Sequence, residues 1–299
     1  MTKVCTLCPR NCSVDRENGE KGICGQTTEV KVARAALHFW EEPCISGTTG
    51  SGTVFFSGCS LHCVFCQNEP IANGTVGKII TIARLAEIFL ELEAQGASNI
   101  NLVTPGHFIP QIREALLLAK QQGMTLPVVY NTSSYESVEA LKALDGLVDI
   151  YLPDFKYMSS ELSKKYSNAA DYAKVAKAAI AEMVRQTGRP VFDEEGEDGL
   201  IKRGTIVRHL TLPGCMEDSK TILKYLHDTY GEKIYISIMN QFTPLEHVAA
   251  YPELNRKITE VEYDELIDYA IDLGIEQGFI QEGETAEESF IPDFDCCGV

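Results

Sequence analysis

The sequence lacks the features of membrane, secreted and nucleic-acid-binding proteins. None of its apolar runs is long enough to span a membrane, and its first residues lack the charged-then-apolar pattern of a secretory signal. The net charge is −17 and no basic stripe offsets it, which argues against nucleic acid as a partner. A glycine-rich phosphate loop is also missing, so no motif points to a phosphorylated metabolite. These absences predict a cytoplasmic protein with no membrane partner and no nucleic-acid partner.

Cysteine, in contrast, is abundant. The 299 residues include 11 cysteines, and 44% of the residues are hydrophobic, enough for a sizeable core. In a reducing compartment, so many thiols indicate metal binding more than disulfides. Seven of them fall into two groups. The sequence assigns no role to the other four, which are Cys44, Cys215, Cys296 and Cys297.

The most informative group is Cys59, Cys63 and Cys66, a C-x3-C-x2-C loop that follows the apolar run 53–57. Three thiolates this close can converge on one [4Fe-4S] cluster, which has four irons and takes cysteine ligands. The fourth iron then stays open for a substrate or cofactor, much as a catalytic zinc keeps an open position. A zinc knuckle and buried thiols are the alternatives, although His62, inside the loop, is poorly placed to complete a zinc tetrahedron.

This spacing, with the aromatic Phe65 just before the last cysteine, resembles the radical S-adenosylmethionine (SAM) superfamily. The resemblance implies a [4Fe-4S] cluster on the three cysteines, with the free iron holding the amino and carboxylate groups of SAM. It also implies reductive cleavage of SAM to methionine and a 5′-deoxyadenosyl radical, which abstracts hydrogen from a substrate. The electron would come from a flavodoxin or ferredoxin-type reductant. The typical fold of the superfamily is a partial βα barrel.

A second group, C-x2-C-x3-C-x11-C, comprises Cys5, Cys8, Cys12 and Cys24. The segment has few apolar residues, so a metal could supply the order that a core cannot. A structural zinc, a second iron-sulfur cluster and four free thiols all remain open. Together with residues 38–47 and the loop ending at Cys66, this group resembles the branch of the superfamily described as pyruvate formate-lyase-activating-enzyme-like.

Apolar strands and amphipathic helices alternate from residue 53 onward. Apolar strands of this kind form a parallel sheet covered by helices. The expected strands are 54–56, 99–103, 127–130, 148–152, 205–210 and 233–238. The expected helices are 81–95, 109–122, a short one near 138–144, 170–187, 217–230 and 260–273. Six units predict an α/β fold, a partial (six-unit) parallel βα barrel with a small Cys-rich N-terminal metal-binding segment.

Three regions are expected along the chain. Residues 1–50 form the Cys-rich N-terminal segment, residues 51–280 the radical SAM partial barrel, and residues 281–299 an acidic C-terminal tail. Residues 292–299 could fold over the barrel and place thiols near the site, but we expect this end to fray. Glu41 and Glu42 could lie near the mouth of the cavity, but we expect them to be solvated loop acids. The acidic run 193–198 reads as an exposed turn.

Parallel barrels place their sites at the carboxyl ends of the strands. Polar residues near the ends of several expected strands would face one rim, and the candidate cofactor contacts among them are Thr104, Asn131, Asp154, Lys156, His209 and Gln241. Asp154 and Lys156 are two residues apart, so on a continuing strand they point to the same face. Lys156 could pair with the carboxylate of SAM, and Asp154 could take its amino group or a ribose hydroxyl. A surface ion pair is the alternative.

The resemblance supports several of these contacts. Asp154-Phe155-Lys156 is similar to the Asp-x-Lys motif with which glycyl-radical-enzyme activases contact SAM. Thr104 stands where many members carry a Gly-Gly-Glu stretch, and it could offer a hydroxyl and a carbonyl instead. Arg208 and His209 lie on the expected strand 205–210, which resembles the activase strand along the nucleoside. The two side chains point to opposite faces, so at most one faces the cavity, and we take His209 as the contact. Phe65 could cover the adenine.

The leading hypothesis is an enzyme of radical SAM type, with a protein or peptide as a possible substrate. Two alternatives stay open. The first is a non-catalytic iron-sulfur or zinc scaffold, and the second is a glycyl-radical-enzyme activase proper. A variant of the leading hypothesis, methyl transfer from SAM, would produce S-adenosylhomocysteine instead of 5′-deoxyadenosine.

Overall fold

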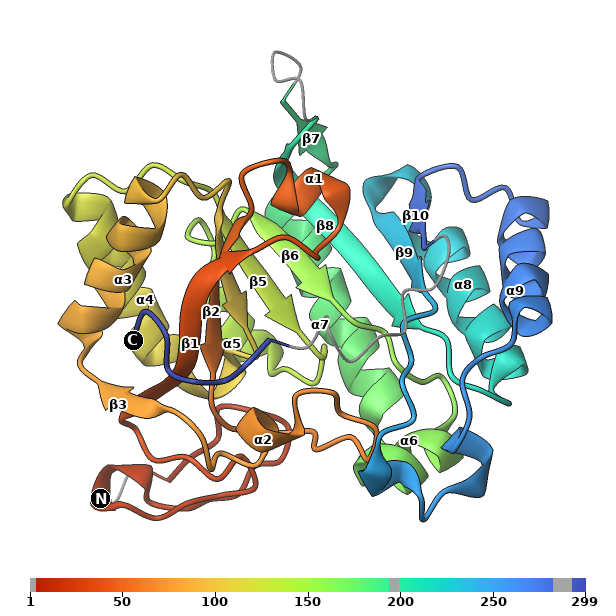
Figure 1. Cartoon of the computed structure of the whole chain (residues 1–299), viewed down its shortest axis with the longest axis horizontal. Helices are drawn as coiled ribbons and strands as arrows, with labels where there is room; N and C mark the ends of the chain where they lie inside the picture. The colour runs from red at the N-terminus through yellow and green to blue at the C-terminus, as the bar shows by residue number, and fades with distance from the viewer. Residues whose placement is uncertain (1–3, 194–198, 282–291) are drawn as a thin grey trace.

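The fold is built on one mostly parallel β-sheet (Figure 1). The structure, a computed structural model, describes residues 4–193, 199–281 and 292–299. Within these ranges the strands that pair in parallel are β2 (Ser51–Phe56), β4 (Ile100–Val103), β5 (Val128–Thr132), β6 (Ile150–Pro153), β8 (Ile201–Leu210), β9 (Tyr235–Met239) and β10 (Gly278–Ile280). All six expected strands are therefore confirmed.

The sheet is open. Two antiparallel strands, β1 (Val30–His38) and β3 (Lys78–Ile80), extend it beyond β2, which gives the order β10-β9-β8-β6-β5-β4-β2-β1-β3. The short β7 (Val191–Phe192) pairs with β8. No pairing among the described strands joins β3 to β10, so both edges stay free. An open, mostly parallel sheet agrees with the expected partial barrel.

Helices connect the parallel strands and cover the sheet. They are α3 (Ile82–Ala94), α4 (Ile109–Gln121), α5 (Val138–Lys142), α7 (Tyr172–Thr187), α8 (Met216–Tyr230) and α9 (Glu260–Asp272), as expected. Thr81 caps α3 by accepting a hydrogen bond from the backbone N–H of Arg84. Two shorter helices, α2 (Glu69–Ala72) and α6 (Ser160–Ser167), lie at the end of the sheet toward which β5 and β6 point (Figure 1). In the described ranges no helix combines the length and apolarity that a membrane crossing requires.

A short helix, α1 (Pro43–Ser46), lies at the opposite end of the sheet (Figure 1). Its buried Cys44 and Ile45 pack against apolar side chains of β5, β6 and β8, which are Val129, Ile150, Leu152, Ile201 and Ile206. Burial of this apolar surface stabilises the contact. The helix therefore closes the amino-terminal end of the sheet's concave face.

Strand alternation then places a polar layer above this apolar floor. Side chains two residues apart on a strand share a face. Asn131 follows Val129, Asp154 follows Leu152 and Arg208 follows Ile206 at that spacing. The three polar residues thus lie nearer the carboxyl ends of β5, β6 and β8.

The end of the chain is ordered against β1, which corrects the expectation of a frayed tail for residues 292–299. The backbone N–H of Cys296 bonds to the carbonyl of Ala33, and the N–H of Ala35 bonds to the carbonyl of Cys297. Phe294 lies edge-on to Phe55 with ring centroids 5.5 Å apart. The first part of the expected tail, 282–291, and most of the acidic run 193–198 lie outside the described residues.

Candidate functional site

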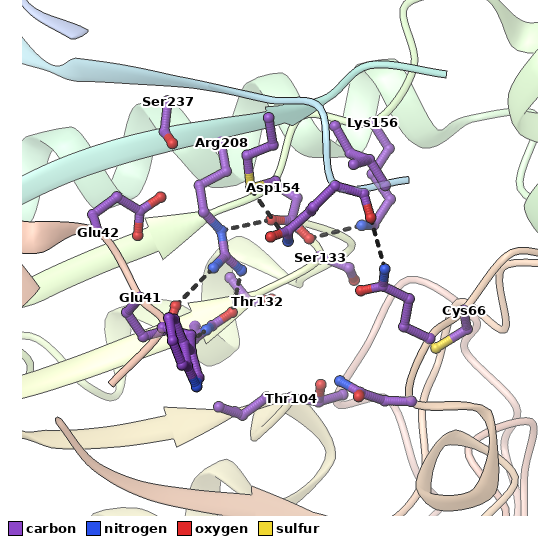
Figure 2. A pocket seen from close by; sticks show the side chains of 18 of the residues that line it. Glu41, Glu42, Cys66, Thr104, Thr132, Ser133, Asp154, Lys156, Arg208 and Ser237 are labelled. Atoms are coloured by element: carbon purple, nitrogen blue, oxygen red, sulfur yellow. Dashed lines mark hydrogen bonds and ion pairs between the residues drawn. The ribbon is translucent and has the colours of Figure 1, made fainter. Parts of the chain in front are cut away.

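A cavity of ≈ 520 Å³ occupies the concave face of the sheet. It reaches from the loop of Cys59, Cys63 and Cys66 to the residues that precede α1, and its lining includes polar side chains from β5, β8 and the segment after β6. Figure 2 shows Cys66 on one side, Glu42 on the other, and Asp154 and Arg208 between them. The volume falls in the range of small-molecule and cofactor sites.

The three loop cysteines all line this cavity. The backbone N–H of Leu61 donates to Cys59 Sγ at 3.3 Å, and the Ser167 hydroxyl donates to Cys63 Sγ at 3.1 Å. Burial raises the pKa of both Cys59 and Cys66, and the neighbouring loop thiols raise it further. The thiols therefore stay neutral until a cation draws off their protons, which is how metal binding couples to proton release.

The donor set suits an iron-sulfur cluster. Three cysteine sulfurs share one cavity wall, and hydrogen bonds to sulfur of the kind made by Leu61 and Ser167 tune such clusters. In the described part of the chain, no three His, Cys, Asp or Glu side chains stand in the geometry of a single-ion metal site. A [4Fe-4S] cube binds each cysteine at a different iron and so spaces the sulfurs more widely than one ion does, which leaves a cluster on this loop compatible with that finding.

A buried charge network lies beside the loop (Figure 2). Lys156 Nζ donates to Asp154 Oδ2 at 2.7 Å, and Arg208 Nε donates to Asp154 Oδ1 at 3.0 Å. Arg208 also donates to Glu41 Oε2 at 3.0 Å and to Asn131 Oδ1 at 2.7 Å. Each member lines the cavity. Asp154 and Lys156 are 15% and 14% exposed at their side chains, so the surface ion pair considered above is excluded.

The contacts within the network favour the charged forms of Asp154 and Lys156. Burial by itself would raise the pKa of Asp154, but the Lys156 and Arg208 cations lower it below its ordinary value. Burial opposes the charge of Lys156 as well, yet the carboxylate of Asp154 raises the pKa of that ammonium. Burying such pairs has a desolvation cost that can exceed their attraction, so they are weak evidence for stability. Their place in a cavity is better explained by ligand binding.

Four more of the predicted cofactor contacts line the cavity: Phe65, Thr104, Asn131 and Gln241. Thr104 has a φ of 57°, which is unusual for a β-branched residue, and its N–H bonds to the carbonyl of Asn131. The Gln241 carbonyl accepts from Gln67 Nε2 at 2.8 Å, which ties the loop after β9 to the cysteine loop. The ring centroid of Phe65 lies 6.1–6.5 Å from the ring centroids of Phe242, Tyr157 and Tyr166. This aromatic packing anchors the cysteine loop.

The assignment of His209 is corrected by the structure. The ring is 2% exposed and lies outside the cavity lining. Its Nδ1 lies 2.8 Å from the Phe155 carbonyl and its Nε2 lies 2.8 Å from Ser219 Oγ. Because a carbonyl only accepts, Nδ1 donates and Nε2 accepts from the serine hydroxyl. His209 therefore joins β8 to α8, and Arg208, on the opposite face, contacts the cavity.

Two acidic residues are also placed differently from expectation. Glu41 and Glu42 were expected to be solvated, but their side chains are buried and line the cavity. Glu41 accepts from Asn101 at 2.9 Å and from Asn131 at 3.2 Å in addition to Arg208. Sequence reasoning missed them because they precede the first parallel strand and reach the site through the packing of α1.

The N-terminal cysteines gather around a second, much smaller cavity of ≈ 10 Å³, which Cys5, Cys8, Cys12 and Cys24 all line. The backbone N–H of Ile23 donates to Cys12 Sγ at 3.3 Å, and a Cβ at Gly22 would stand 2.8 Å from that sulfur. Glycine is thus required there for the sulfur to approach the backbone. Burial raises the pKa of Cys8 to about 12, so a metal would again displace a proton.

The N-terminal segment holds the cysteine loop in place. The Arg10 guanidinium donates to the carbonyls of Ser60 at 2.8 Å and Leu61 at 3.3 Å, within the loop. It also donates to the carbonyls of Ser167 at 2.9 Å and Asn168 at 2.6 Å, at the end of α6. The His62 ring lies 2.8 Å from the carbonyl of Ile23, beside Cys24. These contacts, which sequence reasoning missed, connect the two cysteine groups.

Comparison with known proteins agrees with this geometry. Residues 53–198 match the family model of the radical SAM superfamily. Over these residues the chain is similar to radical SAM domains. The matched stretch includes the three loop cysteines and the Asp154–Lys156 pair, and the superfamily implies a [4Fe-4S] cluster and SAM as cofactors.

The similar proteins cover most of this chain. An uncharacterized protein of Methanocaldococcus jannaschii is 28% identical over 276 residues, which are 90% of this chain and 74% of that protein. Streptococcus suis SuiB has a TM-score of 0.50 to this chain both when bound to its precursor peptide SuiA, at 12% identity, and when bound to S-adenosylmethionine, at 14%. Each comparison covers 75% of this chain but only 46% and 48% of SuiB, so this chain spans less than half of that protein and the likeness is one of fold.

Proposed function

We propose that this chain is a radical SAM enzyme that reductively cleaves SAM beside a [4Fe-4S] cluster held by Cys59, Cys63 and Cys66. When bound, the cluster supplies the electron that releases a 5′-deoxyadenosyl radical for hydrogen abstraction. One observation carries the proposal: the three thiols and the Lys156–Asp154–Arg208 network line the same cavity. The cavity thus offers a cluster loop and charged groups for an amino acid side by side.

The polar residues have separable roles in this proposal. The Lys156 ammonium has three N–H donors, and among the described residues it bonds only to Asp154. It is therefore able to donate to the carboxylate of SAM. Thr104 and Gln241 offer hydroxyl, carbonyl and amide groups on either side of the cavity. Arg208 holds Asp154 and Asn131 in position through its own hydrogen bonds.

A protein or peptide fits the cavity as substrate. The edge strand β10 contributes Gly278, Phe279 and Ile280 to the lining, so the cavity extends to a free edge of the sheet. An opening at an edge admits a loop or a chain end. SuiB, similar in fold, binds a precursor peptide. A flavodoxin or ferredoxin-type protein would supply the electron, and the eleven free thiols suit a reducing cytoplasm.

The N-terminal cysteines, in this proposal, hold a single metal ion such as zinc, and binding it requires the thiols to turn toward one another, because no three of them stand in single-ion geometry in the described structure. Their shared cavity has room for about one water molecule, far less than an iron-sulfur cube requires. Four thiolates around one ion make a closed, structural site. We keep the resemblance to pyruvate formate-lyase-activating enzymes as part of the proposal. The cysteine motifs point to the type of cofactor and do not specify the substrate.

The test is anaerobic reconstitution with iron and sulfide, followed by reduction in the presence of SAM. The expected product is 5′-deoxyadenosine, and replacing Cys59, Cys63 and Cys66 with Ala should abolish it. Replacing the exposed Cys297 with Ala is the matched control and should leave the yield unchanged. Cluster binding without SAM turnover would favour the scaffold alternative, and S-adenosylhomocysteine would indicate methyl transfer. Hydrogen loss from a glycine of a partner protein would identify an activase proper.

A further inference from the structure

Glu42 is a buried residue of the cavity lining, and one of its two carboxyl oxygens, Oε2, is enclosed without a hydrogen-bond partner among the described residues. The residue is 8% exposed and lines the cavity at the side away from the cysteine loop (Figure 2). Ser237 also belongs to the lining, and its hydroxyl lowers the pKa of Glu42, although burial has the larger, opposite effect. Burying a carboxyl oxygen without a hydrogen-bond partner costs free energy, and a bound ligand is one way to offset that cost.

The charges around the cavity leave Glu42 uncompensated. Arg208 and Lys156 carry two positive charges, and Asp154 and Glu41 carry two negative charges that pair with them directly. Glu42 is the third carboxyl group of this lining, and among the described residues it forms no ion pair. Burial accordingly raises its pKa, with the nearby Glu41 adding to the effect and Arg208 opposing it. A cation brought by a ligand would restore the balance.

The carboxyl group of Glu42 has no role in starting α1. The backbone carbonyl of Glu42 accepts from the N–H groups of Ile45 at 2.7 Å and Ser46 at 3.1 Å, and that contact survives any side-chain replacement. The side chain makes no capping hydrogen bond to the helix. Trp40, two residues earlier, also lines the cavity and exposes 63% of its surface, and an indole face is a favourable neighbour for a cation.

We propose that Glu42 binds a basic group of the substrate, an ammonium or a guanidinium, at the end of the cavity opposite the cysteine loop. This inference rests on the proposed function, because it takes the cavity as the place where the substrate meets SAM. The residue is a specificity determinant: its contact fixes one end of the substrate while the other end approaches the cysteine loop. An uncharged or acidic group at that end would leave the buried carboxylate unpaired.

The experiment uses n-butylguanidinium and n-butylammonium as probes and n-butanol as the neutral probe of the same chain length. Binding to the reconstituted protein is measured by anaerobic calorimetry at pH 7, with Glu42→Gln as the variant and Glu139→Gln, on the exposed face of α5, as the control. Wild type and the control should bind at least one cation about tenfold or more tightly than butanol. Glu42→Gln should lose that preference. Equal binding of cation and alcohol by wild type, no binding of either cation, or an unchanged preference in Glu42→Gln would each overturn the proposal.

A second measurement separates a binding role from a structural one. Gln keeps the shape of the side chain and removes the uncompensated charge, so Glu42→Gln should melt no lower than wild type at pH 7. A clear drop in Tm would show that the carboxyl group supports the fold, and the proposal would fail. Wild-type SAM cleavage is scored independently: if it is absent while the cation preference holds, the proposed function fails and the basic-group site stands.

Discussion

Lys156 is a buried cation of the cavity lining with capacity for further hydrogen bonds. Its ammonium is held by Asp154 at one of three N–H positions, and its side chain is 14% exposed. Replacing Lys156 with Met should therefore raise the SAM concentration needed for half-maximal 5′-deoxyadenosine formation by about tenfold or more, since a charge-assisted hydrogen bond contributes about 1.5–3 kcal/mol. The measurement is a SAM titration under anaerobic, reducing conditions.

The control for this titration is Lys142→Met. Lys142 makes a comparable bond to Glu139 on the surface of α5, far from the cavity lining. Its loss should leave the titration unchanged, because Lys142 is exposed and lies outside the cavity lining. An unchanged titration for Lys156→Met, with a lowered Tm, would mean that the Lys156–Asp154 pair serves the fold alone.

His209 should make the stability of the protein depend on pH. Burial lowers the pKa of His209 to about 4. The hydrogen bond to the Phe155 carbonyl raises this pKa and the Lys156 cation lowers it, but burial is the largest effect. Between about pH 6.5 and 4 the unfolded chain takes up a proton that the folded chain does not, so the free energy of unfolding should fall as the pH falls. The slope attributable to one such group is on the order of 1 kcal/mol per pH unit.

Urea unfolding of wild type and His209→Gln at pH 4.5, 5.5 and 7 measures this slope. The variant should be less stable at pH 7 but lose less stability on acidification. His107, whose pKa burial also lowers to about 4, keeps part of the slope in both proteins, so the difference between them is the quantity of interest. His247→Gln, at an exposed position, serves as the reference, and parallel curves for wild type and His209→Gln would contradict the prediction.

At the scale of elements, the cysteine loop depends on a strap from the N-terminal segment. Arg10 donates to four carbonyls that lie on the loop and at the end of α6. Arg10→Ala should raise amide exchange across residues 59–66, by an amount corresponding to about 1–3 kcal/mol of lost local protection. In the reconstituted protein, iron should also pass to a chelator severalfold faster.

Arg113→Ala on the exposed side of α4 is the matched control and should leave the exchange of the loop unchanged. Arg10→Lys should recover only part of the protection, because an ammonium cannot reproduce the fork of a guanidinium. Exchange in Arg10→Ala equal to that of wild type would show that the loop is held by its own contacts, such as the packing of Phe65.

The elements that the sequence predicts correctly are those with strong local signals. Buried parallel strands read as continuous apolar runs, and α3 and α9 carry Thr81 and Thr259 as caps. The sequence analysis missed strand β1 because Ala33, Ala35 and Ala36 have low strand propensity. Pairing with β2 makes this segment a strand despite that low propensity. Strand β10 has three residues, too few for a periodicity.

The sequence predicted that polar residues gather at one rim of the sheet, but it did not predict which of their side chains contact one another. Both Ile206 and Val207 are buried, so the sequence gives no parity that would tell Arg208 from His209. The choice between them is made by tertiary packing: Ile206 packs with Cys44 and Ile45 of α1, and Arg208, two residues further along β8, lies on the same face. Glu42 reaches the cavity only because α1 packs against strands more than eighty residues away in the chain, such as β5, and no local pattern records a contact of that range.

At the scale of the whole molecule, the N-terminal segment should be a metal-ordered brace for the domain. Over residues 4–27 the buried side chains are few, Arg16, Cys24 and Gln26, so the segment has little apolar burial to order it. Its contacts to the cysteine loop and to His107 therefore depend on the cysteine group. The protein with Cys59, Cys63 and Cys66 replaced by Ala should retain about one zinc per chain.

Metal analysis of that variant, grown with zinc and iron both supplied, isolates the N-terminal site from the cluster. Removing the metal with a chelator should lower the Tm and raise exchange over residues 59–66 as Arg10→Ala does, because both changes release the same strap. Additional replacement of Cys5, Cys8, Cys12 and Cys24 should abolish metal retention, whereas Cys215→Ala should not. Iron with sulfide in place of zinc would identify a second cluster and contradict the single-ion proposal. Neither metal above background would show that the brace is held by Arg10 and Arg16 without an ion.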